Sequence, residues 1–433
     1  MATLKVNIEI AGYPTHVGDL EYAYGKEPVF KYAEAYLCSA RPLPISLSLP
    51  LQDEPFTAAQ TKNFFDGLLP EGFTRRAVAQ WLRVDENDYI SILKGLGAEC
   101  LGAVQIVDED YQETSHYEFL TLAEVRALAN EGATKSAAIM TETHLSLAGA
   151  SGKVGLYYDA SNASWLLPKG LAPSTHIVKQ SHVRLQNIVA NEQLALMTAQ
   201  KLGINTAESF IVNLADGEDA NVLLASKRYD RTFQGAVKAI DGLPCPLRLH
   251  QEDFAQALGI SSARKYESVQ GGYLVKIFDL LRKYSANPLE DRVELWRRIV
   301  FNYLVGNTDG HIKNFSLLYS SDLQSVRLAP AYDIISTTVY KQSTRNMSLY
   351  IAGDNLLDKL TKNSFSQAAK DIGLGKRLAE GVFDEMANSF EFALKESAQE
   401  LWEYGFANAK NIADNILLTG GIANKLYDRA TAS

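Results

Sequence analysis

The stretch Gly306-Asn307-Thr308-Asp309-Gly310-His311-Ile312-Lys313-Asn314, with Asp333 further along the chain, decides how this sequence is interpreted. Within it, Asp309 and Asn314 have the spacing Asp-x4-Asn. The same spacing also occurs at Asp216–Asn221 and at Asp358–Asn363, so a match to the spacing alone carries little information. What distinguishes the first copy is the sequence around it.

The residues before Asp309 predict a helix that ends at this loop. Apolar side chains recur three and four residues apart, as on the buried face of an amphipathic helix, at Val293, Trp296, Val300 and Leu304. Gly306-Asn307 ends the predicted helix. Asp309 therefore begins a loop at a rigid helix end, which suits a catalytic base. In the catalytic loop of protein kinases, Asp-x4-Asn supplies the base and a magnesium ligand.

Two neighbours of this motif need their own interpretation. Asp333 follows a short apolar, strand-like run and stands where a second magnesium-binding aspartate is expected. It is followed by Ile334-Ile335 instead of the Phe-Gly usual in kinases. His311 takes the position two residues after the base, where eukaryotic kinases have a lysine. It is either a functional residue or a structural loop histidine.

Length, composition and charge limit the classes of protein. The 433 residues predict two or three domains, and 46% apolar with 21% charged residues is ordinary for a globular protein. No apolar run reaches the length of a membrane span. The three cysteines lie far apart, so a zinc site or disulfide framework is not expected, and a reducing cytoplasm is. With a net charge of −9, DNA binding by the chain alone is not expected.

The sequence divides into three predicted regions in an α+β arrangement of lobes. Residues 1–135 are mixed, 136–240 are β-rich and 241–433 are helical. The elements expected from periodicity and turn residues are strands at Leu4–Ile10, Leu101–Val107, Phe210–Val212 and Asn221–Leu224, a hairpin at Tyr157–Leu167, and helices at Thr57–Phe65, Ile188–Leu202, Leu295–Leu304, Phe383–Ala398 and Ala407–Leu418. Gly203 is expected to end the second of these helices.

A glycine-rich segment runs from Ser146 to Gly155. Its glycines at a spacing of three, with small residues between them, let backbone amides approach a phosphate closely. It is not a Walker A motif, because Leu147 and Val154 replace the required glycine and hydroxyl. The segment is therefore either a phosphate loop or a plain hairpin turn.

A lysine and a glutamate form a second candidate pair. Lys179 ends the short β-branched run Ser174–Lys179, and Glu192 shares an apolar helix face with Ile188 and Leu196. A carboxylate on such a face is costly unless it is paired, and Lys179 is the nearest candidate partner in sequence. A strand lysine paired with a helix glutamate orients ATP phosphates in protein kinases. The alternative is a solvated Glu192 at the rim of the face.

Taken together, these motifs resemble the HipA family of bacterial serine/threonine kinase toxins of type II toxin–antitoxin modules. The matching segments follow one another in order from about residue 4 to beyond residue 420: Phe64-Phe65-Asp66-x-Leu68-Leu69-Pro70, Ser146-x-Ala148-Gly149-Ala150-x-x-Lys153, Thr175-His176-Ile177-x-Lys179, Arg228-Tyr229-Asp230-Arg231, Asn307-Thr308-Asp309 with Lys313-Asn314, and Leu328–Asp333. The resemblance implies a protein-kinase-like two-lobed α+β fold with an extra N-terminal subdomain and an all-helical C-terminal lobe.

The resemblance also implies ligands, partners and residue roles. ATP and Mg²⁺ are the expected cofactors, and the expected partners are a helix-turn-helix, HipB-like antitoxin that binds operator DNA and a protein substrate, in the best-known members a tRNA synthetase. Carried over residue by residue, the family pattern makes Asp309 the base and gives nucleotide or metal contacts to Ser151, Gly152, Lys153, Lys179, Lys227, Tyr229, His311, Asn314 and Asp333, of which Asn314 and Asp333 hold Mg²⁺. Ser146 matches the serine that family members autophosphorylate. The family often has Gln at the position of Ser151 and Glu at that of Lys227.

Two other functions are compatible with the same residues. A small-molecule phosphotransferase uses a similar Asp/Asn/Asp set on a related fold, and the identity of the phosphate acceptor separates it from a protein kinase. A non-catalytic module that only co-represses with its antitoxin predicts lost metal ligands, whereas Asp309, Asn314 and Asp333 are all present.

Overall fold

The structure is a computed structural model. It describes residues 2–424 except 24, 110, 112–113, 150–151, 182–184 and 269–270, and residues 131–134 by their backbone alone. The chain forms two compact units that interleave along the sequence. The first contains Met1–Gln180, Ala225–Ser262 and Ser316–Val326, and the second contains Ser181–Leu224, Ala263–Phe315 and Arg327–Ser433. The predicted boundaries at 135 and 240 stay a prediction. Among the described residues, none of the helices has the length and hydropathy of a membrane span.

The first unit is a mixed α/β structure. Its elements are β1 Ala2–Ile10, β2 Tyr13–Ala23, β3 Lys26–Tyr32, α1 Glu34–Leu37, α2 Ala58–Phe65, η1 Asp66–Leu68, α3 Gly72–Leu82, α4 Tyr89–Leu96, β4 Val104–Asp108, β5 His116–Phe119, α5 Leu122–Glu142, β6 Lys153–Asp159, β7 Ser164–Lys169, β8 His176–Gln180, β11 Arg231–Thr232, β12 Ala239–Ile240, β13 Leu243–Pro244, β14 Leu247–Arg248, β15 Gln251–Asp253, α7 Phe254–Ala257 and β16 Ser316–Tyr319. Three elements have residues in both units, β10 Val222–Lys227, η3 Ser262–Arg264 and β17 Val326–Leu328.

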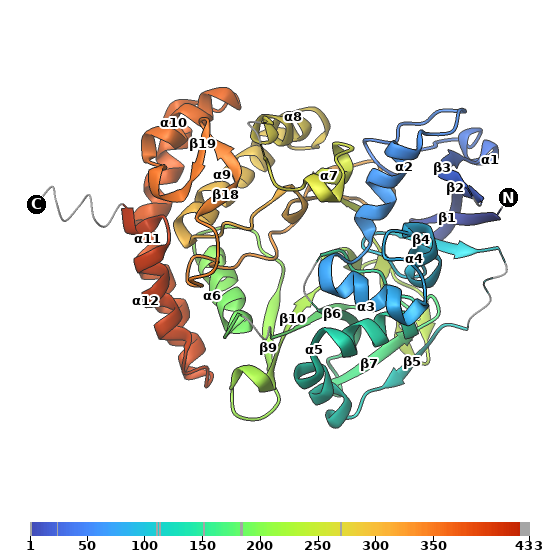
Figure 1. Ribbon diagram of the computed structural model, residues 1–433, viewed down its shortest axis with the longest axis horizontal. Helices are drawn as coiled ribbons and strands as arrows, with labels where there is room; N and C mark the ends of the chain where they lie inside the picture. Colours follow the sequence, from blue (N-terminus) through green and yellow to red (C-terminus); the bar gives the residue numbers. More distant parts are fainter. Residues whose placement is uncertain are drawn as a thin grey trace, which may run out of the picture. The chain divides into compact units, whose positions relative to one another are not determined.

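The N-terminal sheet has the order β3-β2-β1-β4 and confirms the predicted first strand. Leu4, Val6 and Ile8 alternate into the core, as a half-buried strand requires. Strand β4 begins later than predicted, at Val104, because Gly102 has a positive φ of 76° and turns the chain there. Elsewhere in the unit, α3 and α5 pack on each other (Figure 1).

A second sheet contains the neighbouring strands β5-β7-β6-β8, in that order. The glycine-rich segment leads into β6 and ends within it. The predicted hairpin is present, with Tyr157 opposite Leu166 across β6 and β7. Strands β6 and β8 are antiparallel, and their register places Lys153 directly opposite Lys179. Residues that face each other in this way project from the same side of a sheet.

A buried cluster of charges lies within the first unit. Glu99 accepts hydrogen bonds from Arg228 at 3.0 Å, from Arg231 at 2.8 Å and from Arg248 at 2.8 and 3.0 Å. Asp230 pairs with Arg228 at 2.7 Å, and a sixth member, Glu9, pairs with Arg248 at 3.3 Å. Burial opposes the charge of Glu99, but the three guanidinium groups hold the pKa of its carboxyl well below its usual range. Three acids and three bases thus balance one another in this cluster.

The second unit is mainly helical. Its elements are α6 Ile188–Lys201, β9 Ser209–Asn213, η2 Asp219–Asn221, α8 Tyr273–Tyr284, α9 Pro288–Val305, η4 Ile312–Asn314, β18 Asn346–Ile351, β19 Asp354–Leu356, η5 Leu357–Lys359, α10 Lys362–Asp371, α11 Lys376–Glu403 and α12 Ala409–Thr419. The predicted helix from Ile188 is confirmed, and Gly203, with a φ of 77°, follows its end as expected.

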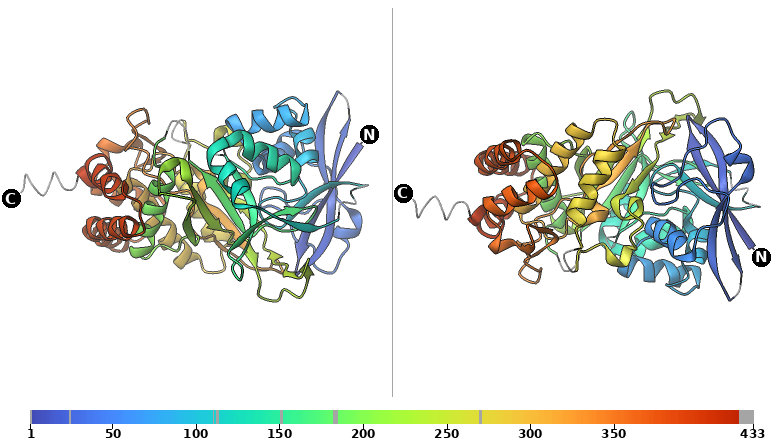
Figure 2. Two further views of the ribbon diagram at one scale, coloured as in Figure 1. Left: turned by 90° about the horizontal axis from the view of Figure 1, so that it is seen from below. Right: turned by 90° about the horizontal axis from the view of Figure 1, so that it is seen from above.

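Helix α9 lies at the centre of this unit. Trp296, Val300 and Leu304 are buried as predicted, whereas Val293 is half-buried. The ring of Trp296 meets Phe365 of α10 edge-on at 5.8 Å, and Phe365 in turn packs on Phe383 of α11 at 5.1 Å. Helices α11 and α12 lie side by side (Figure 2). Near the end of α9, the ring of Tyr303 also packs on Phe365, at 5.0 Å, so the aromatic core holds this end of the helix.

The prediction of a helical region at 241–433 with an all-helical C-terminal lobe needs correction, because β13 to β17 lie within this range and the second unit contains two further strands in it. Strands β18 and β19 form an antiparallel hairpin there, with Ile351 paired to Asp354. Ala352 and Gly353 between them both have positive φ, 51° and 86°, as in a type I′ turn. The hairpin escapes prediction because its strands are short and Ala-Gly is a weaker turn signal than Asn-Gly.

Candidate active site

The loop after α9 is fixed by backbone and amide hydrogen bonds. Gly306 ends the helix in the left-handed region, with a φ of 73°, and its N–H donates to the carbonyl of Tyr303 at 3.1 Å. The N–H of Asn307 donates to the carbonyl of Asn302 at 2.8 Å, and its side-chain oxygen accepts the N–H of Asp309 at 3.0 Å. This last bond is an Asx turn, which explains why an asparagine stands two residues before the aspartate.

Hydroxyl groups from two other segments hold the same loop. Thr337 Oγ1 accepts the N–H of Thr308 at 2.8 Å and donates to the carbonyl of Gly306 at 3.0 Å. Ser348 Oγ in β18 donates to the carbonyl of Thr308 at 2.6 Å. The backbone before Asp309 is therefore bonded on several sides. Such positioning by neighbouring side chains is what a catalytic group requires.

Asp309 itself has an exposed side chain on this buried loop. Its neighbours Thr308 and His311 are 3% and 5% exposed. Gly310 is required here, because a Cβ at that position would lie 2.7 Å from Asn302 Nδ2. An accessible carboxylate on a rigid backbone has the properties of a general base.

Asn314 and Asp333 line one small hollow of about 10 Å³ in the second unit, together with Asn302, Asn307 and Arg298. The side-chain N–H of Asn314 donates to the carbonyl of Asp309 at 3.0 Å, which leaves its oxygen as an acceptor. Asp333 has a φ of 56°, a conformation that few non-glycine residues adopt and that aspartate tolerates better than most. An amide oxygen and a carboxylate are the hard oxygen ligands that Mg²⁺ prefers, so these residues fit the expected ion.

His311 and Tyr266 lie next to Asp309. Tyr266 donates its hydroxyl to Asp309 Oδ1 at 2.5 Å, and its ring meets His311 edge-on at 5.1 Å. The burial of His311 favours the structural alternative for this residue. The backbone carbonyl of buried Lys313 accepts the hydroxyl of Tyr332 at 2.9 Å, which ties the loop to the segment that carries Asp333.

The predicted phosphate-binding residues lie in the first unit. Lys153 and Lys179 are cross-strand partners, and two like charges in that position repel each other unless an anion neutralises them. Lys153 is only 9% exposed, and a Cβ on Gly149 would lie 2.7 Å from its Nζ. Gly149 also has a φ of 107°. A glycine there lets a lysine amine lie close to the loop backbone, which favours the phosphate-loop interpretation over a plain turn.

Ser146 is fully buried at the start of the same loop. Its hydroxyl donates to the carbonyl of Leu68 at 2.8 Å, and its N–H donates to the carbonyl of Glu99 at 2.7 Å. The carbonyl of Gly149 accepts the N–H of Glu71 at 2.9 Å. The loop thus lies on the segment that follows α2. Gly152 is buried, and Ser151 lies outside the described residues.

Lys227 and Tyr229, which the family pattern assigns to the adenine hinge, lie at the end of β10 and just after it. Lys227 is exposed, and the hydroxyl of half-buried Tyr229 bonds to the side-chain oxygen of Gln251. The N–H of Arg228, between them, donates to the carbonyl of Thr175 at 2.9 Å. Arg228 belongs to the buried charge cluster, so its side chain is held in place between the two proposed hinge residues. Glu192 of α6, expected to pair with Lys179, is only 4% exposed, which excludes a solvated rim position.

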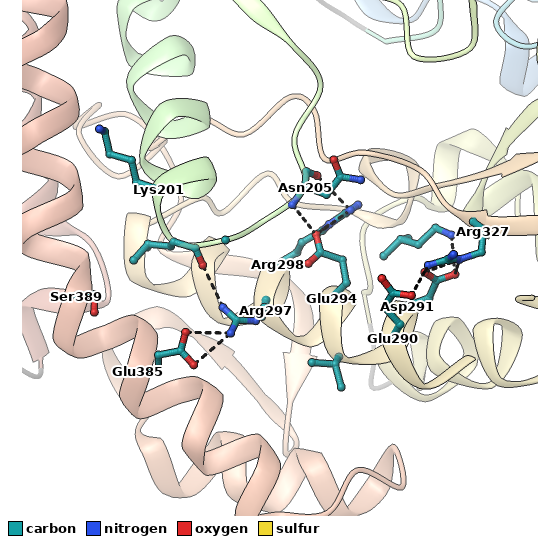
Figure 3. A pocket seen from close by; sticks show the side chains of 14 residues that line it. Lys201, Asn205, Glu290, Asp291, Glu294, Arg297, Arg298, Arg327, Glu385 and Ser389 are labelled. Atoms are coloured by element: carbon teal, nitrogen blue, oxygen red, sulfur yellow. Dashed lines mark hydrogen bonds and ion pairs between the residues drawn. The ribbon is translucent and has the colours of Figure 1, made fainter. Parts of the chain in front are cut away.

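A much larger cavity of the second unit lies elsewhere. It has a volume of about 720 Å³ and is bordered by α6, α9 and α11 (Figure 3). Its cations are paired with acids, namely Arg297 with Glu385, Arg298 with Glu294, Arg327 with Asp291 and Lys201 with Glu400. None of the predicted site residues lines it. Neighbouring acids already neutralise the cations that line this cavity. Its larger volume is therefore no argument that it is the active site.

Sequence reasoning missed the residues that hold the site in place. Thr337, Ser348 and Tyr266 carried no motif signal, because each is an ordinary polar residue far from Asp309 in sequence. Asn302 also gave no signal, because at about 100° per residue it lies on the helix face opposite the predicted apolar stripe. The Asx turn of Asn307 could have been predicted, because Asn-x-Asp after a helix-ending glycine is a turn sequence.

Comparisons with known proteins agree with this geometry. A solved HipA from Shewanella oneidensis, in a complex described as HipA, HipB and operator DNA, matches with a TM-score of 0.74 and 21% identity, covering 96% of this chain and 97% of that one. The fold is accordingly α+β and protein-kinase-like. The putative kinase Y4mE of Sinorhizobium fredii is 34% identical over 83% of this chain and 84% of its own length. The serine/threonine-protein kinase toxin HipA of S. oneidensis is 26% identical over 77% and 75%.

The family assignment rests on two sequence models. The HipA-like C-terminal domain matches residues 145–394, and the HipA N-terminal domain matches residues 8–107. The chain belongs to the HipA family, and the resemblance drawn from its motifs is confirmed. Its relatives and its fold support a kinase-type function.

Proposed function

We propose that this protein is an ATP-dependent serine/threonine protein kinase that acts as the toxin of a toxin–antitoxin pair. The observation that carries the proposal is the exposed carboxylate of Asp309, on a loop whose backbone is bonded on several sides, next to the hollow that Asn314 and Asp333 share. The relatives named as kinases and as a HipA toxin support it.

Each residue has a distinct role in this proposal. Asp309 accepts the proton of the acceptor hydroxyl as the hydroxyl attacks the γ-phosphate. Asn314 and Asp333 hold Mg²⁺, which, when bound, neutralises charge on the phosphates. Lys153 and Lys179 neutralise the phosphates from β6 and β8, together with the loop backbone at Ser151 and Gly152. The remaining nucleotide contacts are assigned to the hinge residues Lys227 and Tyr229.

The decisive experiment compares the wild-type protein with Asp309→Asn in a cell lysate containing [γ-³²P]ATP. Loss of a general base lowers phosphoryl transfer by about 10²–10⁴-fold. Asp358→Asn, in another Asp-x4-Asn match that forms a surface ion pair with Arg345, is the matched control and should label normally. Label on protein supports the proposal. Label only on a small metabolite favours the alternative phosphotransferase, and equal labelling by Asp309→Asn removes this residue from the base role.

A second part of the proposal concerns partners. The net charge of −9 disfavours DNA binding by this chain, and the matched S. oneidensis structure is described as a complex of HipA with HipB and operator DNA. We therefore propose a basic, helix-turn-helix antitoxin as the partner that brings this chain to its operator. A mobility-shift assay should show a shift with the antitoxin present, and a salt-sensitive shift by this chain alone would contradict the proposal.

The proposal also assigns Ser146 as an autophosphorylation site that switches the enzyme off. Its position ahead of the glycine loop supports the assignment, because a phosphate there adds about −1.5 to −2 charges next to the proposed triphosphate site. Ser151 is the competing site. Mass spectrometry after incubation with Mg-ATP distinguishes the two.

A further inference from the structure

The hydroxyl of Tyr266 lies on the proposed base. It donates to Asp309 Oδ1 at 2.5 Å, and the tyrosine side chain comes from the segment between η3 and α8. Tyr266 is 46% exposed, so it lies on the accessible side of the loop and not in the core. Both residues belong to the second unit, so their contact is internal to one compact body.

The segment around Tyr266 is fixed to the catalytic loop by its buried neighbour. The backbone N–H of Glu267 donates to the carbonyl of Ser348 at 3.1 Å, and its carboxylate accepts the N–H groups of Tyr273 and Tyr350 at 3.1 and 3.0 Å. Glu267 is 6% exposed. Ser348 also donates to the carbonyl of Thr308, so one strand holds both Tyr266 and the base loop. The hydrogen bonds of Glu267 and Ser348 thus hold the segment of Tyr266 where its hydroxyl points at Asp309.

The chemistry of the base explains what such a contact does. An ionised carboxylate only accepts hydrogen bonds, and a general base must accept one from the hydroxyl that it activates. A tyrosine hydroxyl on Asp309 Oδ1 makes the same kind of hydrogen bond as an incoming acceptor hydroxyl. A phenol stays protonated at neutral pH and attacks poorly, so it occupies the base without reacting.

We infer that Tyr266 is a positioning residue that occupies Asp309 in the resting enzyme and competes with the acceptor hydroxyl. This inference rests on the proposed role of Asp309 as base. An acceptor hydroxyl that uses the same oxygen, Oδ1, displaces the tyrosine hydroxyl, and no covalent bond changes in that exchange. The competition lowers basal turnover with poor acceptors such as water, and thereby protects ATP until an acceptor is bound.

The test uses Tyr266→Phe, which removes the hydroxyl and keeps the ring on His311. The matched control is Tyr284→Phe, also in the second unit and 38% exposed. Both tyrosines follow a lysine whose Nζ lies over the ring, at 5.4 Å for Tyr266 and 4.7 Å for Tyr284. Initial rates of ADP release are measured with saturating Mg-ATP, first with no added acceptor, in the Ser146→Ala background, and then with myelin basic protein.

The full-length Tyr266→Phe protein should release ADP roughly three- to tenfold faster than wild type, the effect of losing a partly exposed hydrogen bond to a charged group. Its KM for ATP and its melting temperature should stay unchanged, and Tyr284→Phe should match wild type. A merely structural role predicts a loss of turnover. Unchanged or slower turnover in Tyr266→Phe, or mass-spectrometric evidence of phosphate on Tyr266, would overturn this inference and leave the proposed role of Asp309 standing. If Asp309→Asn releases ADP as fast as wild type, the proposed base role falls and the inference with it.

Discussion

At the scale of single residues, the backbone conformation of Asp333 decides which substitution tests its proposed role. Its φ of 56° is tolerated by asparagine and disfavoured for alanine, so Asp333→Asn removes the charge with little backbone strain. We expect this variant to bind Mg-ATP roughly tenfold more weakly, about 1.4 kcal/mol, and metal-free ATP with unchanged affinity. Calorimetry with Mg²⁺ and with EDTA measures both. Equal loss in the two titrations would mean that Asp333 contacts the nucleotide instead of the metal.

A buried acid of the first unit gives a pH-dependent prediction. Burial raises the pKa of Glu252 to about 7, despite hydrogen bonds from Ser46 at 2.5 Å, from Tyr319 and from the N–H of Leu47 at 3.1 Å. The folded protein therefore holds a proton that the unfolded chain releases near pH 4.5. The stability from this proton is fully present below pH 4.5 and is lost as the pH rises through 7.

Glu252→Gln should remove this dependence. Between pH 5 and 8 the wild-type protein should lose up to about 3 kcal/mol more unfolding free energy than the variant, because one pKa unit corresponds to about 1.36 kcal/mol. Urea denaturation at several pH values measures the difference between the two curves. Buried His250 nearby also makes stability depend on pH, because its pKa is lowered from 6.5 to about 4, but it is present in both proteins and cancels in the difference between their curves. Parallel curves for the two proteins would show that Glu252 does not titrate here.

At the scale of elements, the segment from Ser146 to Gly149 is a candidate switch. Ser146 is fully buried, so its hydroxyl reaches a phosphate donor only after the segment opens, and a phosphate does not fit back into its place. In the protein phosphorylated at Ser146, amide hydrogen exchange should accelerate at Glu71, whose N–H is bonded to Gly149. Mass spectrometry of peptides that cover Ser146–Gly149 and Glu71 measures this exchange. Ser146→Ala, which loses one hydrogen bond, is the control, and equal protection in the two proteins would argue against the switch.

The elements also show what periodicity predicts and where it stops. Helices α6, α9, α11 and α12 were all expected, because each is long enough for the 3.6-residue pattern to repeat. The hairpin β18–β19 was missed, since strands of six and three residues hold too little pattern. It is the element that supplies Ser348 to the catalytic loop. Local patterns therefore indicated the loop that carries Asp309 but not the strand that supports it.

At the scale of the whole molecule, the sequence indicated the proposed site residues more readily than the residues that support them. Asp309 and Asn314 were found because they lie close together in the chain and a helix end precedes them. The partnership of Tyr266 with Asp309 spans a tertiary contact that only the folded unit creates. The register of Lys153 with Lys179 likewise depends on strand pairing, because one residue of slip would place the two amines on opposite faces.

The buried charge cluster joins the two family domains within the first unit. Glu99 lies in the matched region 8–107, whereas Arg228, Arg231 and Arg248 lie in the region 145–394. All four side chains are almost fully buried. Each guanidinium has been taken out of water, and the carboxylate of Glu99 bonds all three. Removing one partner of a buried ion pair leaves an uncompensated charge, which costs more than the pair itself contributes.

Glu99→Gln should therefore destabilise the protein by about 3–5 kcal/mol, although it keeps the size and shape of the side chain. Glu385→Gln is the control, because it breaks an exposed ion pair with Arg297 and should cost less than about 1 kcal/mol. Urea denaturation followed by tryptophan fluorescence and by far-UV circular dichroism measures both. Arg228 lies between Lys227 and Tyr229, so Glu99→Gln should also weaken ATP binding below the midpoint of unfolding. Wild-type stability in Glu99→Gln would mean that Asp230 and Glu9 alone neutralise the three arginines.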